Sequence, residues 1–97
     1  MYGTIARIRP RAGQLGAIER LMAEWEAEMR PRTPGSHDGY LFVPDAGDGT
    51  TAHLVAVFDD EASYRASAAS PEQDAWYRRL RALLEADPDW MDGEFRR

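Results

Sequence analysis

The chain has 97 residues, is 43% hydrophobic and 30% charged, and carries a formal net charge of −5. This length suits one domain over residues 1–97, and the acidic excess argues against a nucleic-acid partner, which would need a basic face. Cysteine is absent, which excludes disulfides and cysteine-ligated zinc, and no apolar run suggests a signal or a membrane span, so we expect a cytoplasmic protein without a membrane partner.

The first half of the chain predicts a strand and then a helix. Residues 2–9 alternate around Ile5 and Ile8, which is typical of a strand. From Gln14 to about Arg30, apolar residues recur every three or four positions and predict an amphipathic helix. The prolines of "RPRTPG" cannot continue that helix and should end it.

The second half predicts three strands and two helices. Residues 37–45 and 51–58 read as strands joined by a turn around Gly47 and Asp48-Gly49. A short helix should follow Asp59 and Asp60, which are N-cap candidates, and should end at about Ala68. The helix from Ser70 to about Ala86 should begin with a capping box in which Gln73 reaches back to Ser70. Residues 90–96 alternate as a last strand.

The order β-α-β-β-α-β predicts an α+β, ferredoxin-like fold, with a four-stranded antiparallel sheet and the helices on one face. Such a sheet should have one polar face. In residues 54–58, however, both faces carry apolar side chains. We therefore expect two copies to pair sheet to sheet, forming a homodimeric α+β barrel.

Three stretches carry a resemblance to a known family, and they are "YGTIARIRPRAG", "PGSHDGYLFVPD" and "VAVFDDEASYRASAASPEQDAWYRRL". Together they resemble the antibiotic biosynthesis monooxygenase-like domains of the dimeric α+β barrel superfamily. The resemblance implies a barrel interior, beside the second helical segment, that holds a small aromatic or polyketide-like molecule. It also implies that some members oxygenate this molecule with O2 and no cofactor.

A separate branch of that superfamily degrades heme with an Asn, a Trp and a His. By resemblance these positions fall on Ala6, Ser67 and Tyr77, and the sequence contains no Asn. Heme degradation is therefore not expected. The resemblance also supplies no complete set of oxygenase residues for this sequence.

The candidate ligand-binding residues are Trp76, Tyr77, Ser67 and Arg7. On a helix, Trp76 and Tyr77 point to opposite edges of the buried face, so we do not expect one shared aromatic site. Both could be packing or could line a pocket, and Tyr77 is favoured for a pocket. Ser67 is a candidate through the resemblance. Arg7 could hold an anionic group or could be a surface arginine.

His53 and Tyr77 are the candidate catalytic residues. If His53 faces the interior, it is the plausible base at neutral pH, and otherwise it is a half-buried structural histidine. His37 and His53 should lie about 20 Å apart along the sheet, so no shared metal is expected. Two functions stay open, namely a cofactor-independent monooxygenase and a non-catalytic ligand-binding or accessory module, with heme binding a third option.

Overall fold

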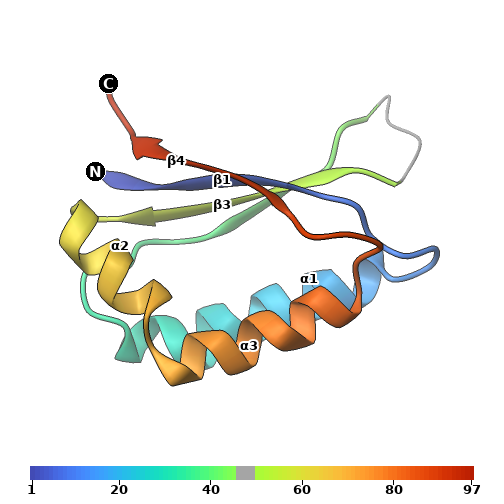
Figure 1. Ribbon diagram of the computed structural model, residues 1–97, viewed down its shortest axis with the longest axis horizontal. Coiled ribbons are helices and arrows are strands. Elements are labelled where there is room, and N and C mark those ends of the chain that lie inside the picture. The colour runs from blue at the N-terminus through green and yellow to red at the C-terminus, as the bar shows by residue number, and fades with distance from the viewer. Residues whose placement is uncertain (46–49) are drawn as a thin grey trace.

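The computed structural model describes residues 1–45 and 50–97 and confirms the ferredoxin-like prediction. Four antiparallel strands form one sheet in the order β2-β3-β1-β4. Figure 1 shows the helices on one side of this sheet and the two termini near one end. The elements are β1 (Tyr2–Ile8), α1 (Leu15–Glu24), η1 (Trp25–Met29), η2 (Arg30–Arg32), β2 (Tyr40–Phe42), β3 (Ala52–Phe58), α2 (Glu61–Ala68), α3 (Pro71–Ala82) and β4 (Asp89–Glu94).

The register of the central strands decides which side chains face the helices. In β1, Ala6 pairs with Leu54 of β3 on one side and with Trp90 of β4 on the other. Because side chains alternate along a strand, Ala6 and the other even-numbered residues of β1 face the helices. Their partners in β3 and β4 face the same way. Ile5 and its partners face away from the helices.

One hydrophobic core lies between the sheet and the helices. Its most completely buried large side chains come from β1, α1, α3 and the segment after α3, and they are Ile8, Ile18, Leu80 and Leu84. Each such side chain stabilises the fold by about 1.5–3 kcal/mol relative to exposure. Leu80 thus anchors α3 to the core beneath the sheet.

Two predicted elements are shorter than expected. The strand predicted over 37–45 is regular only at Tyr40–Phe42, and the predicted turn around residue 47 lies outside the described residues. The helix predicted to Ala86 ends at Ala82. There the backbone of residues 83–85 pairs with the segment that follows β1, since Arg11 N donates to Leu83 O and Glu85 N donates to Arg9 O. These bonds replace the next helical turn.

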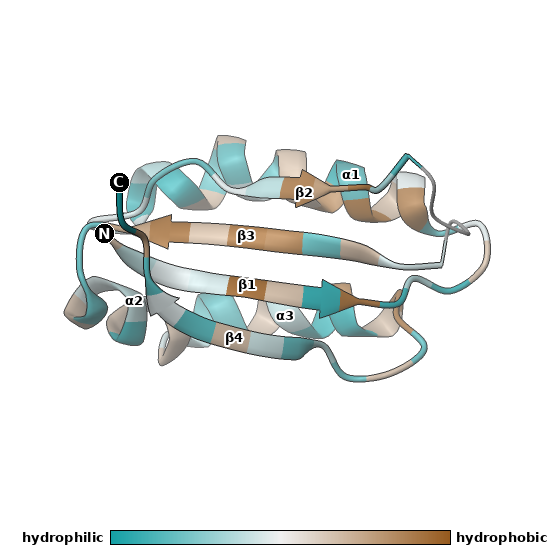
Figure 2. Cartoon of the chain, turned by 90° about the horizontal axis from the view of Figure 1, so that it is seen from above, coloured by the Kyte–Doolittle hydropathy of each residue, from teal (hydrophilic) through white to brown (hydrophobic). Residues whose placement is uncertain are grey.

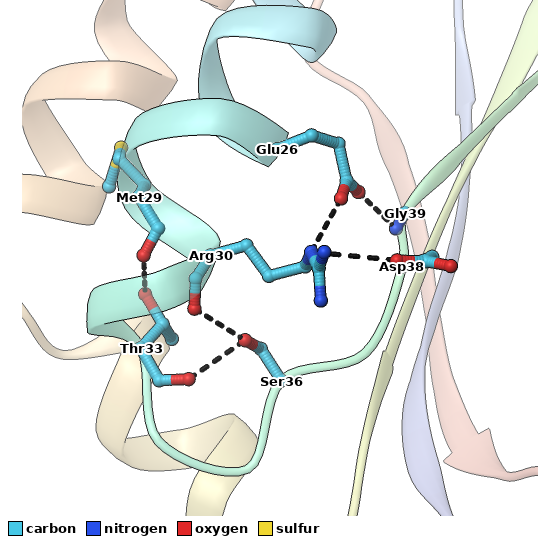
Figure 3. A network of polar contacts seen from close by, with 7 residues as sticks. All are labelled: Glu26, Met29, Arg30, Thr33, Ser36, Asp38 and Gly39. Atoms are coloured by element: carbon cyan, nitrogen blue, oxygen red, sulfur yellow. Dashed lines mark hydrogen bonds and ion pairs between the residues drawn. The ribbon is translucent and has the colours of Figure 1, made fainter.

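The first helix changes its winding near its end. It is α-helical to Glu24, continues as a π-helical turn over Trp25–Met29, and closes with a 3₁₀ turn through Arg32. The carboxylate of Glu26, in the π turn, accepts from Gly39 N and lies 2.7 Å from Arg30 Nε. Figure 3 shows how this network, with Asp38 and Ser36, ties the end of the helix to the segment that leads into β2.

The predicted helix caps are confirmed, except for one half of the capping box. Asp60 accepts from Ser63 N at 2.8 Å, and Ser70 accepts from Gln73 N at 3.0 Å. The prediction that the Gln73 side chain returns to Ser70 is wrong. Its Oε1 instead accepts from Trp25 Nε1 at 3.0 Å. A buried indole needs an acceptor, and this long-range partner satisfies it.

We predict that Gly3→Ala destabilises the protein, because a side chain at this position would overlap the neighbouring strand. A Cβ there would come within 1.9 Å of Ala56 O and 3.1 Å of the Phe95 ring. Relief of this overlap should lower the free energy of unfolding by about 1–3 kcal/mol, measured by urea denaturation. Gly93 pairs with Gly3 across the sheet and has open space at its Cβ. An equal loss in the Gly93→Ala control would contradict the steric explanation.

Candidate functional site

A cavity of about 490 Å³ lies between the helix-facing side of the sheet and the helices. Its walls are mostly apolar and include aromatic rings from several elements of the chain, namely Trp25, Phe58, Tyr64, Trp76, Tyr77 and Trp90. Polar side chains reach it as well, namely Thr4, Ser67, Gln73, Asp74 and Asp92. A mostly apolar cavity with a few polar groups is the usual form of a small-molecule site.

Two tryptophans are held in this wall by hydrogen bonds to the protein itself. Trp76 is buried, and its Nε1 donates to Leu21 O at 3.2 Å. Trp25 donates to Gln73 Oε1. Since both indole N–H groups are already bonded, these residues offer the cavity only ring surface. The same two bonds join α3 to the first helix.

Tyr77 points from α3 toward β4, where its ring lies 5.9 Å from the ring of Trp90, centroid to centroid. Burial, assisted by the negative charge of Asp87, raises the pKa of Tyr77 above its ordinary value. Trp76 leaves the helix on the other flank, toward α1, as its spacing predicts. Nevertheless both side chains line the one cavity. The expectation that they would not share a site is therefore wrong, because the cavity spans the whole width of the buried face of α3.

At the polar end of the cavity, Tyr64 and Asp92 belong to a hydrogen-bond network that continues outside the lining to Arg65 and Tyr2. Tyr64 Oη donates to Asp92 Oδ1 at 2.9 Å, Arg65 Nη1 donates to Asp92 Oδ2 at 3.1 Å, and Arg65 Nη2 donates to Tyr2 Oη at 3.0 Å. Burial alone would raise the pKa of Asp92, but the hydrogen bonds from Tyr64, Thr4 and Arg65 outweigh it and lower this pKa. Burial and the bond to Asp92 raise the pKa of Tyr64 to about 12. Asp92 is therefore held ionised and Tyr64 neutral.

The other candidates lie on the opposite side of the sheet. His53 of β3 pairs with Arg7 of β1, so both side chains leave the face that points away from the helices. Arg7 is bound to Asp89 at 2.9 Å, with both side chains exposed. The His53 ring lies edge-on to Phe42, and its buried Nδ1 has no hydrogen-bond partner.

The structure thus brings Ser67, Trp76 and Tyr77 together and separates them from Arg7 and His53. The cause is the two-residue period of the strand, which turns Leu54 inward and its neighbour His53 outward. Sequence reasoning missed Tyr64 and Asp92. The two-residue period of residues 90–96 places Trp90 and Asp92 on one face of the last strand, but only the folded sheet shows that this face meets the cavity.

Neither a metal centre nor a membrane span is seen in the part of the chain that the structure describes. Within residues 1–45 and 50–97, no three His, Asp or Glu side chains gather closely enough to hold a metal ion. Among the same residues, no helix combines the length and the apolar character needed to cross a bilayer.

Comparison with known proteins identifies the family. SnoaB from Streptomyces nogalater, a cofactor-independent oxygenase, shares 21% identity and a TM-score of 0.81, over 99% of this chain and 93% of its own. Rv0793 from Mycobacterium tuberculosis shares 18% identity and a TM-score of 0.77, over 99% of this chain and 95% of its own. At these identities the two structures show a common fold. None of the curated proteins matches. Residues 1–79 match the family model described as antibiotic biosynthesis monooxygenase, and the chain therefore belongs to the antibiotic biosynthesis monooxygenase family.

Proposed function

We propose that this chain is a single cytoplasmic domain over residues 1–97, active as a homodimer, that binds a small aromatic or polyketide-like molecule and oxidises it with O2 without a cofactor. The observation that carries the proposal is the cavity of about 490 Å³ with six aromatic side chains in its wall. A flat, fused-ring molecule suits such a wall, because offset and edge-on ring contacts add to the burial of apolar area.

Membership of the family supports an oxidation, and SnoaB is described as a cofactor-independent oxygenase. In the reaction that we propose for this chain, a ring CH2 group and O2 become a ring carbonyl and water. One oxygen atom enters the product, the other leaves as water, and the substrate supplies all four electrons. The domain would then contribute binding, orientation and exclusion of water.

A non-catalytic ligand-binding module is the second candidate, and one observation favours it. Asp92, with its lowered pKa, is a weak base, and Tyr64, with a pKa of about 12, is a weak acid. A general acid or base works best when its pKa lies near the operating pH. His53, the residue type suited to that role, lies on the other face of the sheet.

The homodimer would form through the sheet face that points away from the helices. Figure 2 looks onto this side and shows apolar segments along β1, β2 and β3. The face exposes Phe42 at 59% and Met91 at 64%, beside Ile5 and Val57. Large exposed apolar side chains gathered on one face are typical of a protein interface. A second copy seated there would also bury the ring of His53.

We predict that filling the cavity blocks the function. The Ser67→Phe variant places a ring in the space that Ser67 borders. It should weaken the binding of an anthrol-type phenol about tenfold or more, measured by calorimetry, and should reduce any oxygen uptake with this compound. Ala75→Phe, at an exposed position of α3 outside the cavity, is the control. If the wild-type protein binds the phenol but takes up no oxygen, the non-catalytic candidate is the right one. If Ser67→Phe binds as tightly as the wild type, the cavity is not the binding site.

We predict that binding of a neutral aromatic ligand does not change between about pH 5 and about pH 8. Over this range Asp92 stays ionised, because its pKa is lowered, and Tyr64 stays protonated, because its pKa is about 12. The dissociation constant, followed through the fluorescence of the cavity tryptophans, should be flat. An inflection within this range that the His53→Gln variant removes would show instead that His53 takes part.

We predict that a charge on the outer sheet face prevents dimerisation. Met91→Glu and Phe42→Glu, at exposed positions, should shift a dimer to monomers without loss of helical content, since burying an unpaired charge is costly. Light scattering coupled to gel filtration measures the mass. Ala75→Glu, exposed on α3, should leave the mass unchanged. A wild-type monomer at high concentration would refute the homodimer.

A further inference from the structure

Asp92 brings a charged group with unused bonding capacity to the cavity wall. An ionised carboxylate offers about four lone-pair positions, two on each oxygen. Tyr64 takes one position on Oδ1, and Arg65 takes one on Oδ2. Its side chain is 29% exposed and lines the cavity. The carboxylate therefore keeps the capacity to accept at least one further hydrogen bond from a molecule in the cavity.

The cation that neutralises Asp92 lies outside the cavity. Arg65 is not among the residues that line it, and none of the described lining residues is an arginine. Asp74, the other carboxylate of the lining, is likewise paired with a residue outside it, Arg78, at 2.9 Å. A ligand thus meets carboxylate oxygens before it meets a positive charge. Like charges at close range cost several kcal/mol, so this arrangement disfavours an anionic ligand.

The position of Asp92 is fixed relative to the aromatic wall. The Tyr64 ring packs against the rings of Tyr2 and Phe58, each with centroids 5.6 Å away, and the Arg65 guanidinium lies 5.3 Å from the Tyr64 centroid. Trp90 precedes Asp92 by two residues on β4 and so lies on the same face, about 7 Å away along the strand. A ring packed against Trp90 could therefore place a substituent at Asp92.

We propose that Asp92 selects and orients the ligand, accepting a hydrogen bond from a hydroxyl group on an aromatic ring and disfavouring a ring that carries a carboxylate there. This inference rests on the proposed function of the cavity as an aromatic site. Tyr64 and Arg65 act as positioning residues that hold Asp92 in place. A hydrogen bond to an ionised acceptor is stronger than a neutral one, which makes the hydroxyl a discriminating feature.

Three naphthalenes that differ in one substituent test the proposal by calorimetry on the full chain. The wild type should bind 2-naphthol about tenfold more tightly than 2-methylnaphthalene, and 2-naphthoate about tenfold more weakly than 2-naphthol. In Asp92→Ala both ratios should fall to about threefold or less. Asp89→Ala is the matched control, because Asp89 lies on the same strand but on the other face, paired with Arg7. It should retain both ratios.

Asp92→Asn keeps the test decisive if Asp92→Ala fails to fold, since it preserves an acceptor oxygen while removing the charge. This variant should bind 2-naphthoate better than the wild type does, relative to 2-naphthol, with unchanged circular dichroism. If folded Asp92 variants bind all three compounds with the same affinity ratios as the wild type, the role of Asp92 is overturned and the aromatic site stands. Failure of all three compounds to bind the wild type would refute the aromatic site itself, and the role of Asp92 with it.

Discussion

In the central strands β1 and β3, the two-residue alternation of side chains controls what each face of the sheet can contact. Each strand residue must face either the helices or the outer side, and a shift of one position would exchange the two sets. With Ala6 against Leu54, the inner set meets the core and the cavity. The outer set, which includes Val57 and His53, forms the second apolar face. The core, the cavity and the proposed dimer surface all follow from this one register.

The cavity also depends on long-range hydrogen bonds between helices. Trp25 bonds to Gln73 and Trp76 bonds to Leu21 O, so each indole joins the first helix to α3. Trp25 is the first residue of the π-helical turn, and such turns frequently occur at functional sites. The π turn and its Glu26 network also hold Gly39, which borders the cavity. The aromatic wall is thus part of the scaffold that supports it.

The charged end of the cavity has a different physical character from its wall. Asp92 and Tyr64 come from β4 and α2, and their mutual hydrogen bond moves their pKa values apart, toward a fixed anion and a fixed neutral phenol. Such a pair is suited to holding a ligand and poorly suited to moving protons near neutral pH. If the domain oxidises its ligand, the reactivity would have to come mainly from the ligand and O2.

The order of helices and strands and the caps at Asp60 and Ser70 could be predicted from the sequence, although not the ends of β2 and α3, because local structure depends on neighbours within about four residues. Tertiary packing is the reason that Gln73 bonds to Trp25 instead of Ser70, that Asp92 meets Tyr64, and that His53 turns away from Tyr77. The first two pairs are separated by 48 and 28 residues in sequence. Whether such distant residues meet depends on how strands pair and helices pack, and no local pattern records it.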